Sequence, residues 1–265
     1  MKWSTGILVA LLWITVAGML LSNIVIKKEF DKVDKADSYW TYGKVLDQPF
    51  KYLVIDGGNI TNIAFEPSPN CSVRVLHDYQ RNHDNPFSAT VRHDSLYLKF
   101  TYQSTDPGEK NWMKWITLVR IFAPEIRSVQ VINSNFAMFK LKQKKLKLDM
   151  SGRSKFEVES FIPDLDSLSI AQKDSSEAVF EMSPEYKPAP AAGNQAKPVV
   201  ESIADKSLRK SAMGMTMQFL HASLHGYSIL DVGGAQIRDL SLDMADSSAI
   251  VLSGGALSKY CPGSH

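Results

Sequence analysis

The apolar residues of this chain alternate with polar ones along most of its length, and one alternating phrase is written three times. It reads LKLDMSGRSKFEV from Leu146, LSLDMADSSAIVL from Leu240 and, in a looser copy, LSIAQKDSSEAVF from Leu168. Each copy consists of a strand of period two, a small polar corner that contains serine, and a second strand of period two. Repetition of this kind predicts stacked strand–corner–strand units.

The same alternation predicts where the chain turns. Leu141 and Leu146 have opposite parity, and a strand that changes parity would send its apolar side chains to the opposite face. We therefore predict a corner at residues 144–145. If Val129 and Leu168 occupy the same repeat position as Leu146, the steps are 17 and 22 residues, which is the length range of solenoid repeats.

Other segments before and after the repeat also read as strands. Residues 52–55 run into the turn signal DGGN, residues 91–100 read as a hairpin, and residues 115–122 form a strongly apolar strand. Residues 183–206 break the pattern with four prolines, which cannot join a sheet ladder. No segment of the remainder shows a helical stripe, so we predict an all-β fold with a Pro/Ala-rich excursion at 183–206.

The N-terminal region differs from the rest because residues 6–26 form an uncharged apolar run of 21 residues. About 20 such residues are needed to cross a bilayer as a helix. A signal peptide has a shorter apolar core, roughly 7–15 residues, followed by an A-x-A-like cleavage site that is not evident here. We therefore predict a single transmembrane α-helix that acts as a membrane signal anchor (1–26), a charged juxtamembrane stalk (27–49) and a β domain (50–265).

The orientation of this span has two readings. Lys2 precedes it, whereas Lys27, Lys28, Lys32 and Lys35 follow it, and the positive-inside rule would place the following domain in the cytoplasm. The envelope character of the domain, given below, favours the opposite orientation. We adopt the second reading, with an extracytoplasmic (periplasmic) domain, although the lysine count opposes it.

The overall charge and the cysteines exclude some classes of protein. A net charge of +2 over 265 residues is too small to indicate nucleic acid as a partner. Cys71 and Cys261 are the two cysteines, too few for a disulfide framework or a zinc knuckle. They either pair with each other in an oxidising compartment or stay unpaired.

From about Phe50 to Tyr260 the chain resembles the bacterial head GIN domain family, also known as putative auto-transporter adhesins. The likeness rests on ordered phrases: PFKYLVIDGGNITNIAFEP, the TVRHDSLYLKF hairpin, WITLVRIFAPEIRSVQVINS, and the LDMSGRSKFEV and LDMADSSAIVLSG repeats. The resemblance implies a right-handed β-helix-like solenoid with strand hairpins at its N-terminal end, located in the cell envelope. It implies no catalytic motif, and the adhesin role comes only from the resemblance.

Two groups of residues are candidates for chemistry. The pairs His77-Asp78, His83-Asp84 and His93-Asp94 combine imidazole with carboxylate, which can bind a metal or orient a general base; chance occurrence in turns is the simpler interpretation.

The second group is a run of lysines, whose cationic face could hold anionic polysaccharide or lipid headgroups. A solvated sheet face that discourages aggregation is the alternative. The lysines are Lys140, Lys142, Lys144, Lys145 and Lys147.

Several enzyme signatures are missing: G-x-S-x-G, the P-loop, H-E-x-x-H and the Rossmann glycines. Asp149 and Asp243 share a repeat position, but Ala171 holds it in the middle copy, so no acidic ladder of the polysaccharide-lyase kind is predicted. We predict a membrane-anchored binding or structural module with no catalytic activity, no cofactor and no metal, whose partners are the membrane and an envelope protein or polysaccharide. The alternative is a carbohydrate-active or metal-dependent envelope enzyme that uses the His-Asp pairs.

Overall fold

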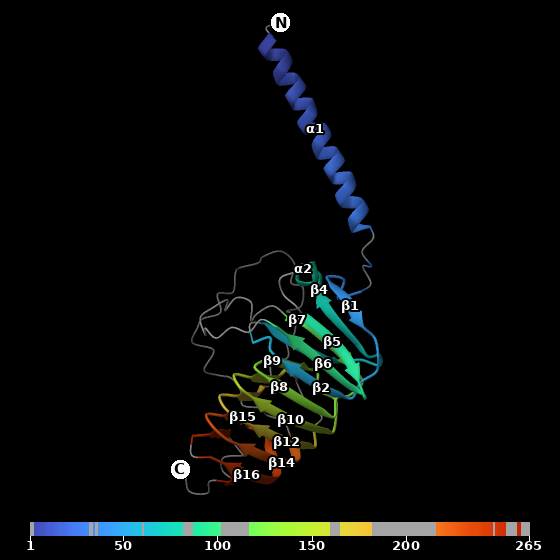
Figure 1. The fold of residues 1–265 in the computed structure, drawn as a ribbon. Helices are drawn as coiled ribbons and strands as arrows, with labels where there is room; N and C mark the ends of the chain where they lie inside the picture. The colour runs from blue at the N-terminus through green and yellow to red at the C-terminus, as the bar shows by residue number, and fades with distance from the viewer. Residues whose placement is uncertain are drawn as a thin grey trace, which may run out of the picture. The chain divides into compact units, whose positions relative to one another are not determined.

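The computed structural model describes residues 3–31, 34, 37–59, 61–81, 87–101, 117–159, 165–181, 216–245, 247–252 and 259–260. The chain divides into two compact units, Met1–Gly43 and Lys44–His265. In the described part of the chain, the first unit is dominated by one helix, and the second consists mainly of strands (Figure 1).

Helix α1 (Trp3–Phe30) confirms the helix predicted for the apolar run and extends it at both ends. Its segment Gly6–Phe30 is long and apolar enough to cross a membrane, and its described side chains are exposed. Strand β1 (Tyr42–Leu46) lies inside the stretch predicted as a stalk.

The second unit contains two sheets. Sheet A has nine strands in the order β1, β4 (Ser72–Leu76), β7 (Thr117–Ala123), β3 (Asn62–Pro67), β9 (Asn135–Phe139), β11 (Lys155–Glu159), β13 (Glu177–Glu181), β15 (Ile229–Gly233), β17 (Ala249–Leu252). Sheet B has eight strands in the order β16 (Gln236–Met244), β14 (Thr216–Leu224), β12 (Ser167–Gln172), β10 (Lys145–Ser151), β8 (Ser128–Ile132), β2 (Tyr52–Asp56), β6 (Ser95–Phe100), β5 (Phe87–Arg92).

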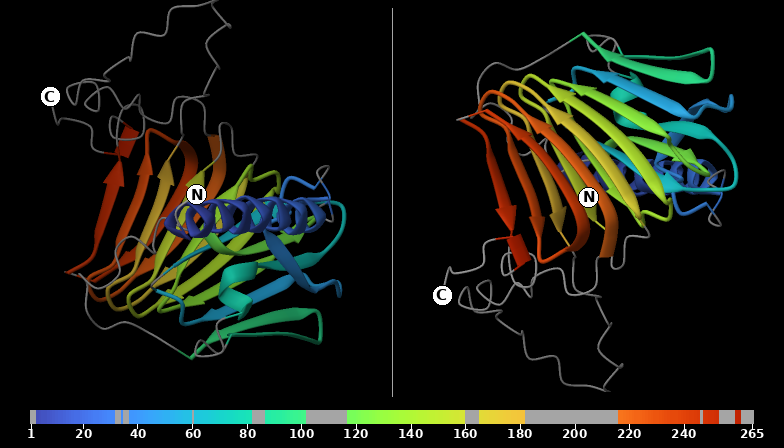
Figure 2. Two further views of the ribbon diagram at one scale, coloured as in Figure 1. Left: turned by 90° about the horizontal axis from the view of Figure 1, so that it is seen from above. Right: turned by 90° about the horizontal axis from the view of Figure 1, so that it is seen from below.

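From β8 onward, successive strands alternate between the two sheets, and each pairs in parallel with the strand before and after it in its own sheet. We call a sheet B strand, its corner and the following sheet A strand a rung. Five rungs are stacked in this way, from β8/β9 to β16/β17, and Figure 2 shows them running in order toward the red end of the chain. The stacked strand–corner–strand units predicted from the repeat are confirmed.

The register corrects two details of the predicted repeat. Val129 pairs with Leu148 rather than with Leu146, so that repeat step is two residues longer than predicted. The rung β14/β15 also separates the copies at Leu168 and Leu240; it keeps the first leucine of the pattern as Leu220 but has Ala222 where its neighbours carry Ile170 and Leu242. The parity and the predicted corner before β10 are nevertheless correct, because Leu141 and Leu146 are both buried.

The N-terminal end of the stack has a different topology. The pair β2/β3 lies between β6/β7 and β8/β9, although it comes first in the sequence. The hairpin predicted for residues 91–100 is confirmed as antiparallel β5 and β6, and β4 runs antiparallel to β7. The short helix α2 (His77–Arg81) follows β4, which departs from the all-β prediction for this domain.

Buried serines form a column at the corners where sheet B passes into sheet A. Ser154 Oγ donates to the carbonyl of Ser151 at 2.6 Å, and Ser228 Oγ donates to that of His225 at the same distance. The hydroxyls of Ser176 and Ser228 lie 3.4 Å apart on adjacent rungs. The hydroxyls of Ser134, Ser154 and Ser228 therefore satisfy backbone carbonyls at the turns, where the ladder is interrupted. The buried corner serines are Ser134, Ser154, Ser176 and Ser228.

The core fills the space between the inner faces of the two sheets. Phe136, Phe156 and Phe180 stack along sheet A with ring centroids 5.8 Å apart in each pair. Leucine and isoleucine from the sheet B strands face them, and these side chains are almost fully buried. Because such inner residues recur at the same register on each rung, every rung buries its apolar face against its neighbours.

Candidate functional site

The five lysines predicted as a cationic surface are all exposed. Lys140, Lys142 and Lys144 lie in the corner between β9 and β10, Lys145 begins β10, and Lys147 lies on the outer face of that strand. The structure therefore brings the lysines together at one corner and its adjoining strand. Period two within β10 explains the outward position of Lys147, since Leu146 and Leu148 are buried.

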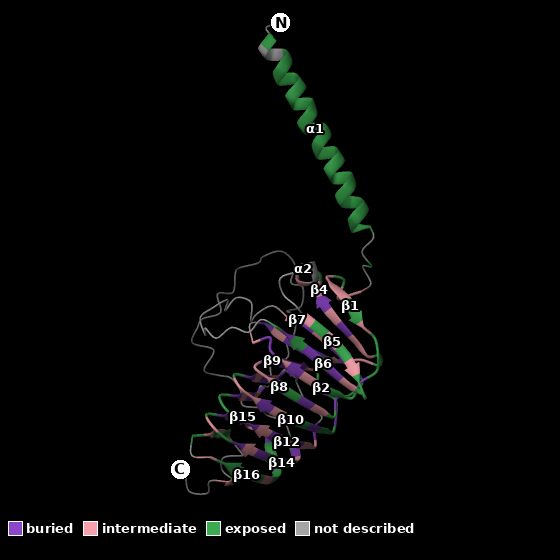
Figure 3. Cartoon of the chain, in the orientation of Figure 1, coloured by how far each residue is buried: buried purple, intermediate pink, exposed green. Residues whose placement is uncertain are grey.

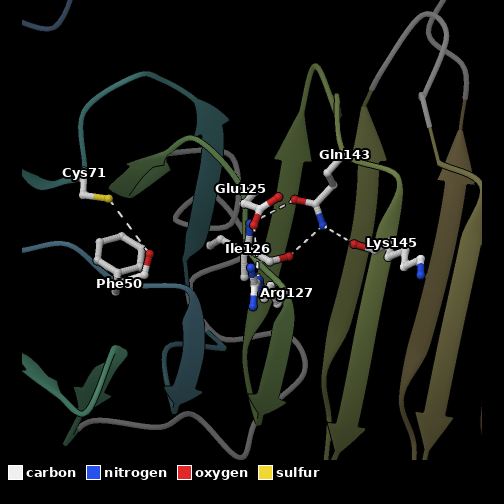
Figure 4. Close-up of polar contacts among 7 residues, drawn as sticks. All are labelled: Phe50, Cys71, Glu125, Ile126, Arg127, Gln143 and Lys145. Atoms are coloured by element: carbon white, nitrogen blue, oxygen red, sulfur yellow. Dashed lines mark hydrogen bonds and ion pairs between the residues drawn. The ribbon is translucent and has the colours of Figure 1, made fainter.

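The corner is held by the buried side chain of Gln143 (Figure 4). Its Nε2 donates to the carbonyls of Ile126 and Lys145 at 2.6 and 2.8 Å, and its Oε1 accepts from the N–H of Ile126 at 3.0 Å. Ile126 belongs to the preceding corner, between β7 and β8. Gln143 thus ties two stacked corners together and fixes the backbone that carries the lysines.

Arg127 adds a sixth cation beside the lysines, because its carbonyl accepts the N–H of Lys147 at 3.1 Å. Its guanidinium contacts Glu125 at 3.2 Å. The hydrogen bond and the charge of Glu125 raise the pKa of Arg127, with smaller contributions from Tyr52. Arg127 is therefore cationic at all physiological pH values.

We define the basic corner as these six cations. Three of them contact carboxylates: Lys144 with Asp166 at 3.6 Å, Lys147 with Asp149 at 3.2 Å, and Arg127 with Glu125. Six cations against three carboxylates leave a net positive surface. Exposed ion pairs of this kind are worth only about 0–1 kcal/mol, so a competing anion can replace them. The six cations are Arg127, Lys140, Lys142, Lys144, Lys145 and Lys147.

A second polar cluster, which the sequence analysis missed, lies on the outer face of β14 and β16. Ser223 Oγ lies 3.1 Å from His225 Nε2 and 3.4 Å from Asp243 Oδ2, and His225 Nε2 lies 3.6 Å from the same carboxylate. A catalytic triad uses opposite ring nitrogens for the serine and the carboxylate. Here one nitrogen faces both, so the three residues do not have triad geometry.

The His-Asp pairs do not form a common site in the described part of the chain. His77 and Asp78 begin helix α2, and His93 and Asp94 occupy the β5–β6 turn with φ of 47° and 61°. His83-Asp84 lies outside the described residues. Within the described ranges, no group of three or more His, Cys, Asp or Glu side chains is arranged to hold a metal ion.

Two other predictions can be placed. Asp149 and Asp243 do share one column on the outer face of sheet B, with Ala171 and Ser223 between them, so the interruption predicted for an acidic ladder is present. The half-buried Cys71 thiol lies 4.0 Å from the carbonyl of Phe50 (Figure 4). Cys261 lies outside the described residues.

Comparison with known proteins does not establish a family. No family model matches the chain, and no curated protein matches it. Three of the solved structures that match align with 80% of it. A putative lipid binding protein from Parabacteroides distasonis is 13% identical, with 96% of its own chain covered and a TM-score of 0.36. A putative adhesin from Bacteroides fragilis is 9% identical, with 96% covered and a TM-score of 0.38. A putative adhesin from Parabacteroides merdae is 13% identical, with 95% covered and a TM-score of 0.31. TM-scores at this level carry no argument about fold or function.

Proposed function

We propose that this chain is a membrane-anchored binding module of the bacterial cell envelope with no catalytic activity. In this proposal residues 6–26 cross the membrane once, and the domain that follows is a right-handed β-solenoid of the head GIN type in the periplasm. The main observation in support of this proposal is the basic corner. Its six cationic side chains are exposed, and hydrogen bonds from Gln143 fix the backbone segment that carries the lysines.

The ligand class follows from the charge and its spacing. Charges within about 10 Å of one another are poorly screened at physiological salt, so neighbouring lysines on one corner act together on an extended anion. Ammonium groups on flexible stems suit spread-out carboxylate, sulfate or phosphate groups better than one planar anion. We therefore propose a polyanion as the ligand, supplied either by an acidic polysaccharide or by lipid headgroups.

The test compares the full chain, in uncharged maltoside micelles, with a variant in which Lys140, Lys142 and Lys145 are replaced by Gln. The probes are dextran sulfate and vesicles that contain phosphatidylglycerol. We expect the variant to bind its ligand about ten-fold more weakly and with a shallower salt dependence, because fewer ions are exchanged on binding. Preference for one of the two probes identifies the source of the anion.

The matched control replaces three exposed lysines outside the basic corner, Lys44, Lys99 and Lys173, and therefore removes the same charge. If both triple variants lose affinity equally, net charge rather than the basic corner explains binding, and the proposal fails. Protease treatment of intact spheroplasts tests the topology. Digestion of the domain is expected, and its protection would place the domain in the cytoplasm.

A further inference from the structure

The last rung of the stack exposes apolar side chains that every earlier rung buries (Figure 3). Leu242 and Met244 of β16 are 39% and 37% exposed, whereas their register partners on β14, Ala222 and Leu224, are 0% exposed. Leu240 is half-buried, although its partner Leu220 is almost fully buried. The inner face of β16 is therefore built like a core strand but has no strand packed over it among the described residues.

Among the described residues, no strand pairs with the outer backbone edge of β16 over residues 239–244. The N–H of Ala245 donates to the carbonyl of Leu224, and in a parallel pair alternate residues face the same neighbour. Leu240, Leu242 and Met244 therefore direct their N–H and C=O groups away from β14. At the start of the strand, Lys259 and Tyr260 donate to the carbonyls of Ile237 and Arg238 at 2.6–3.3 Å.

The other end of the stack has a different arrangement. There, β5 pairs antiparallel with β6 and β4 pairs antiparallel with β7, so the parallel ladder ends in reversed strands. An exposed edge with an apolar face is a template for adding another strand. Among the described residues, β16 is an edge strand of sheet B that combines an open backbone edge over residues 239–244 with exposed apolar side chains, so it is an edge where the fold can accept a further strand.

The outer face of this edge indicates the chemistry of the added strand. Asp239 and Asp243 are exposed on the same face, on either side of Ser241. His225 lies 3.6 Å from Asp243, and the cations Arg238 and Lys259 are confined to the covered start of the strand. Opposite charges on adjacent strands stabilise pairing, and like charges oppose it.

We propose that the β16 edge binds an extended peptide segment of another protein, in which apolar and basic residues alternate. Its apolar side chains pack over Leu240, Leu242 and Met244, and its basic side chains lie beside Asp239 and Asp243. A second copy of the chain fits less well, because pairing two β16 edges brings four carboxylates onto one narrow face. This proposal does not depend on the basic corner, which would repel such a peptide.

The test measures binding of synthetic nine-residue peptides, which match the length of β16, to the full chain in uncharged maltoside micelles. The probes are alternating Val–Lys and alternating Val–Glu. We expect the Val–Lys peptide to bind about ten-fold more tightly, as strand addition with favourable cross-strand charges requires. Exchanging Asp239 and Asp243 for Lys is expected to reverse that preference. Asp149→Lys, on the outer face of β10, is the matched control and should leave it unchanged.

A second variant tests pairing through the backbone. Leu242→Pro removes an N–H that points away from β14 and breaks no hydrogen bond to that strand, so an edge strand should tolerate the proline and the protein should still fold. Because the added strand loses a backbone donor, Val–Lys binding should fall about ten-fold. The proposal is overturned if Val–Lys binding survives both the charge reversal and the proline. It is also overturned if sedimentation shows a dimer that Leu242→Pro dissociates, since a second copy then occupies the edge. Failure of both peptides to bind the wild-type chain would also overturn the proposal.

Discussion

Asp174 and Gly152 occupy equivalent corners of neighbouring rungs, and the Oδ2 atom of Asp174 accepts the backbone N–H of Gly152 at 2.8 Å. One rung earlier, Asn133 Oδ1 accepts the N–H of Arg153 at 3.0 Å. Asn133, Gly152, Asp174 and Gly226 all have positive φ. The column therefore alternates a short polar side chain with a glycine, and the side chains of Asn133 and Asp174 both accept backbone N–H groups of the Gly152–Arg153 corner that lies between them.

Gly152→Ala should destabilise the domain by about 2–3 kcal/mol. A Cβ at this position would lie 2.1 Å from Asn133 Oδ1, and φ is +67°. The left-handed conformation costs alanine roughly 1–2 kcal/mol, and displacing Asn133 breaks its bond to Arg153, worth about 1 kcal/mol. Urea denaturation of the domain measures the change.

A double-mutant cycle with Asn133→Gly checks the cause of this effect. Asn133 has a φ of 48°, so glycine is tolerated there, and it removes the side chain that the new Cβ would meet. We expect Gly152→Ala to cost about 1 kcal/mol less in that background, as for residues in direct contact. Strictly additive effects would mean that backbone strain alone is responsible.

Asp174 is predicted to tolerate Asn better than Ala. Asn retains an oxygen that can accept the N–H of Gly152 and adopts positive φ more readily than other residues do. Ala loses the acceptor and keeps the strain of a φ of 64°, a combined cost of about 2 kcal/mol. The comparison of urea midpoints for the two variants tests this order, and a more stable Ala variant would contradict it.

The corners were predictable because they change the parity of the apolar residues. Leu141 and Leu146 are both buried only if the chain turns between them, and this signal survives in a single sequence. The rung β14/β15 was not identified as a copy because Ala222 and His221 occupy positions where the other copies carry Leu or Ile and Lys or Ser, respectively. Two signals could have identified it: Leu220, at the register of Leu168 and Leu240, and the corner serine Ser228.

The order of the strands in the stack was not predictable from the pattern. Tyr52 pairs with both Ser95 and Ser128, so the first pair of strands lies between two later ones. Every rung presents the same kind of apolar inner face, and period two cannot distinguish one neighbour from another. For the same reason the copy at Leu240 has the sequence pattern of a buried strand. Its apolar side chains are exposed because this strand is the last one in its sheet at that end of the stack.

The lysines of the basic corner were visible in the sequence as a run, whereas Arg127 was not, because it lies 13 or more residues earlier and joins them only through stacking of corners. Long-range pairing also creates the cluster of Ser223, His225 and Asp243. Both sites combine residues from different rungs. A candidate site of that kind can be identified only when the register of strand pairing is known.

Stability is expected to decrease at alkaline pH in a way that depends on Tyr79. Burial raises the pKa of Tyr79 above its ordinary value of 10.0, so its contribution to stability is fully present below the unfolded pKa. That contribution is lost as the pH rises through the higher pKa of the folded state. Tyr79→Phe should show a smaller loss of stability between about pH 10 and pH 12 than the wild type in urea titrations. Tyr227→Phe, at an exposed corner residue, is the control and should follow the wild type.

Gln143→Ala should be among the most destabilising single substitutions at the corners. It removes three hydrogen bonds to the backbone of Ile126 and Lys145, and an unsatisfied buried backbone group costs about 1–3 kcal/mol. Allowing for water entry at the corner, we expect a loss of about 2–4 kcal/mol in the free energy of unfolding.

The matched control is Gln130→Ala on the exposed face of β8, where a surface substitution should change stability by less than about 0.5 kcal/mol. If the two alanine variants unfold at the same urea concentration, Gln143 does not hold the stacked corners. In that case Gln143 does not fix the backbone that carries the lysines of the basic corner. Its removal should then leave polyanion binding unchanged. If Gln143 does hold them, its removal should weaken dextran sulfate binding while all six cations are still present.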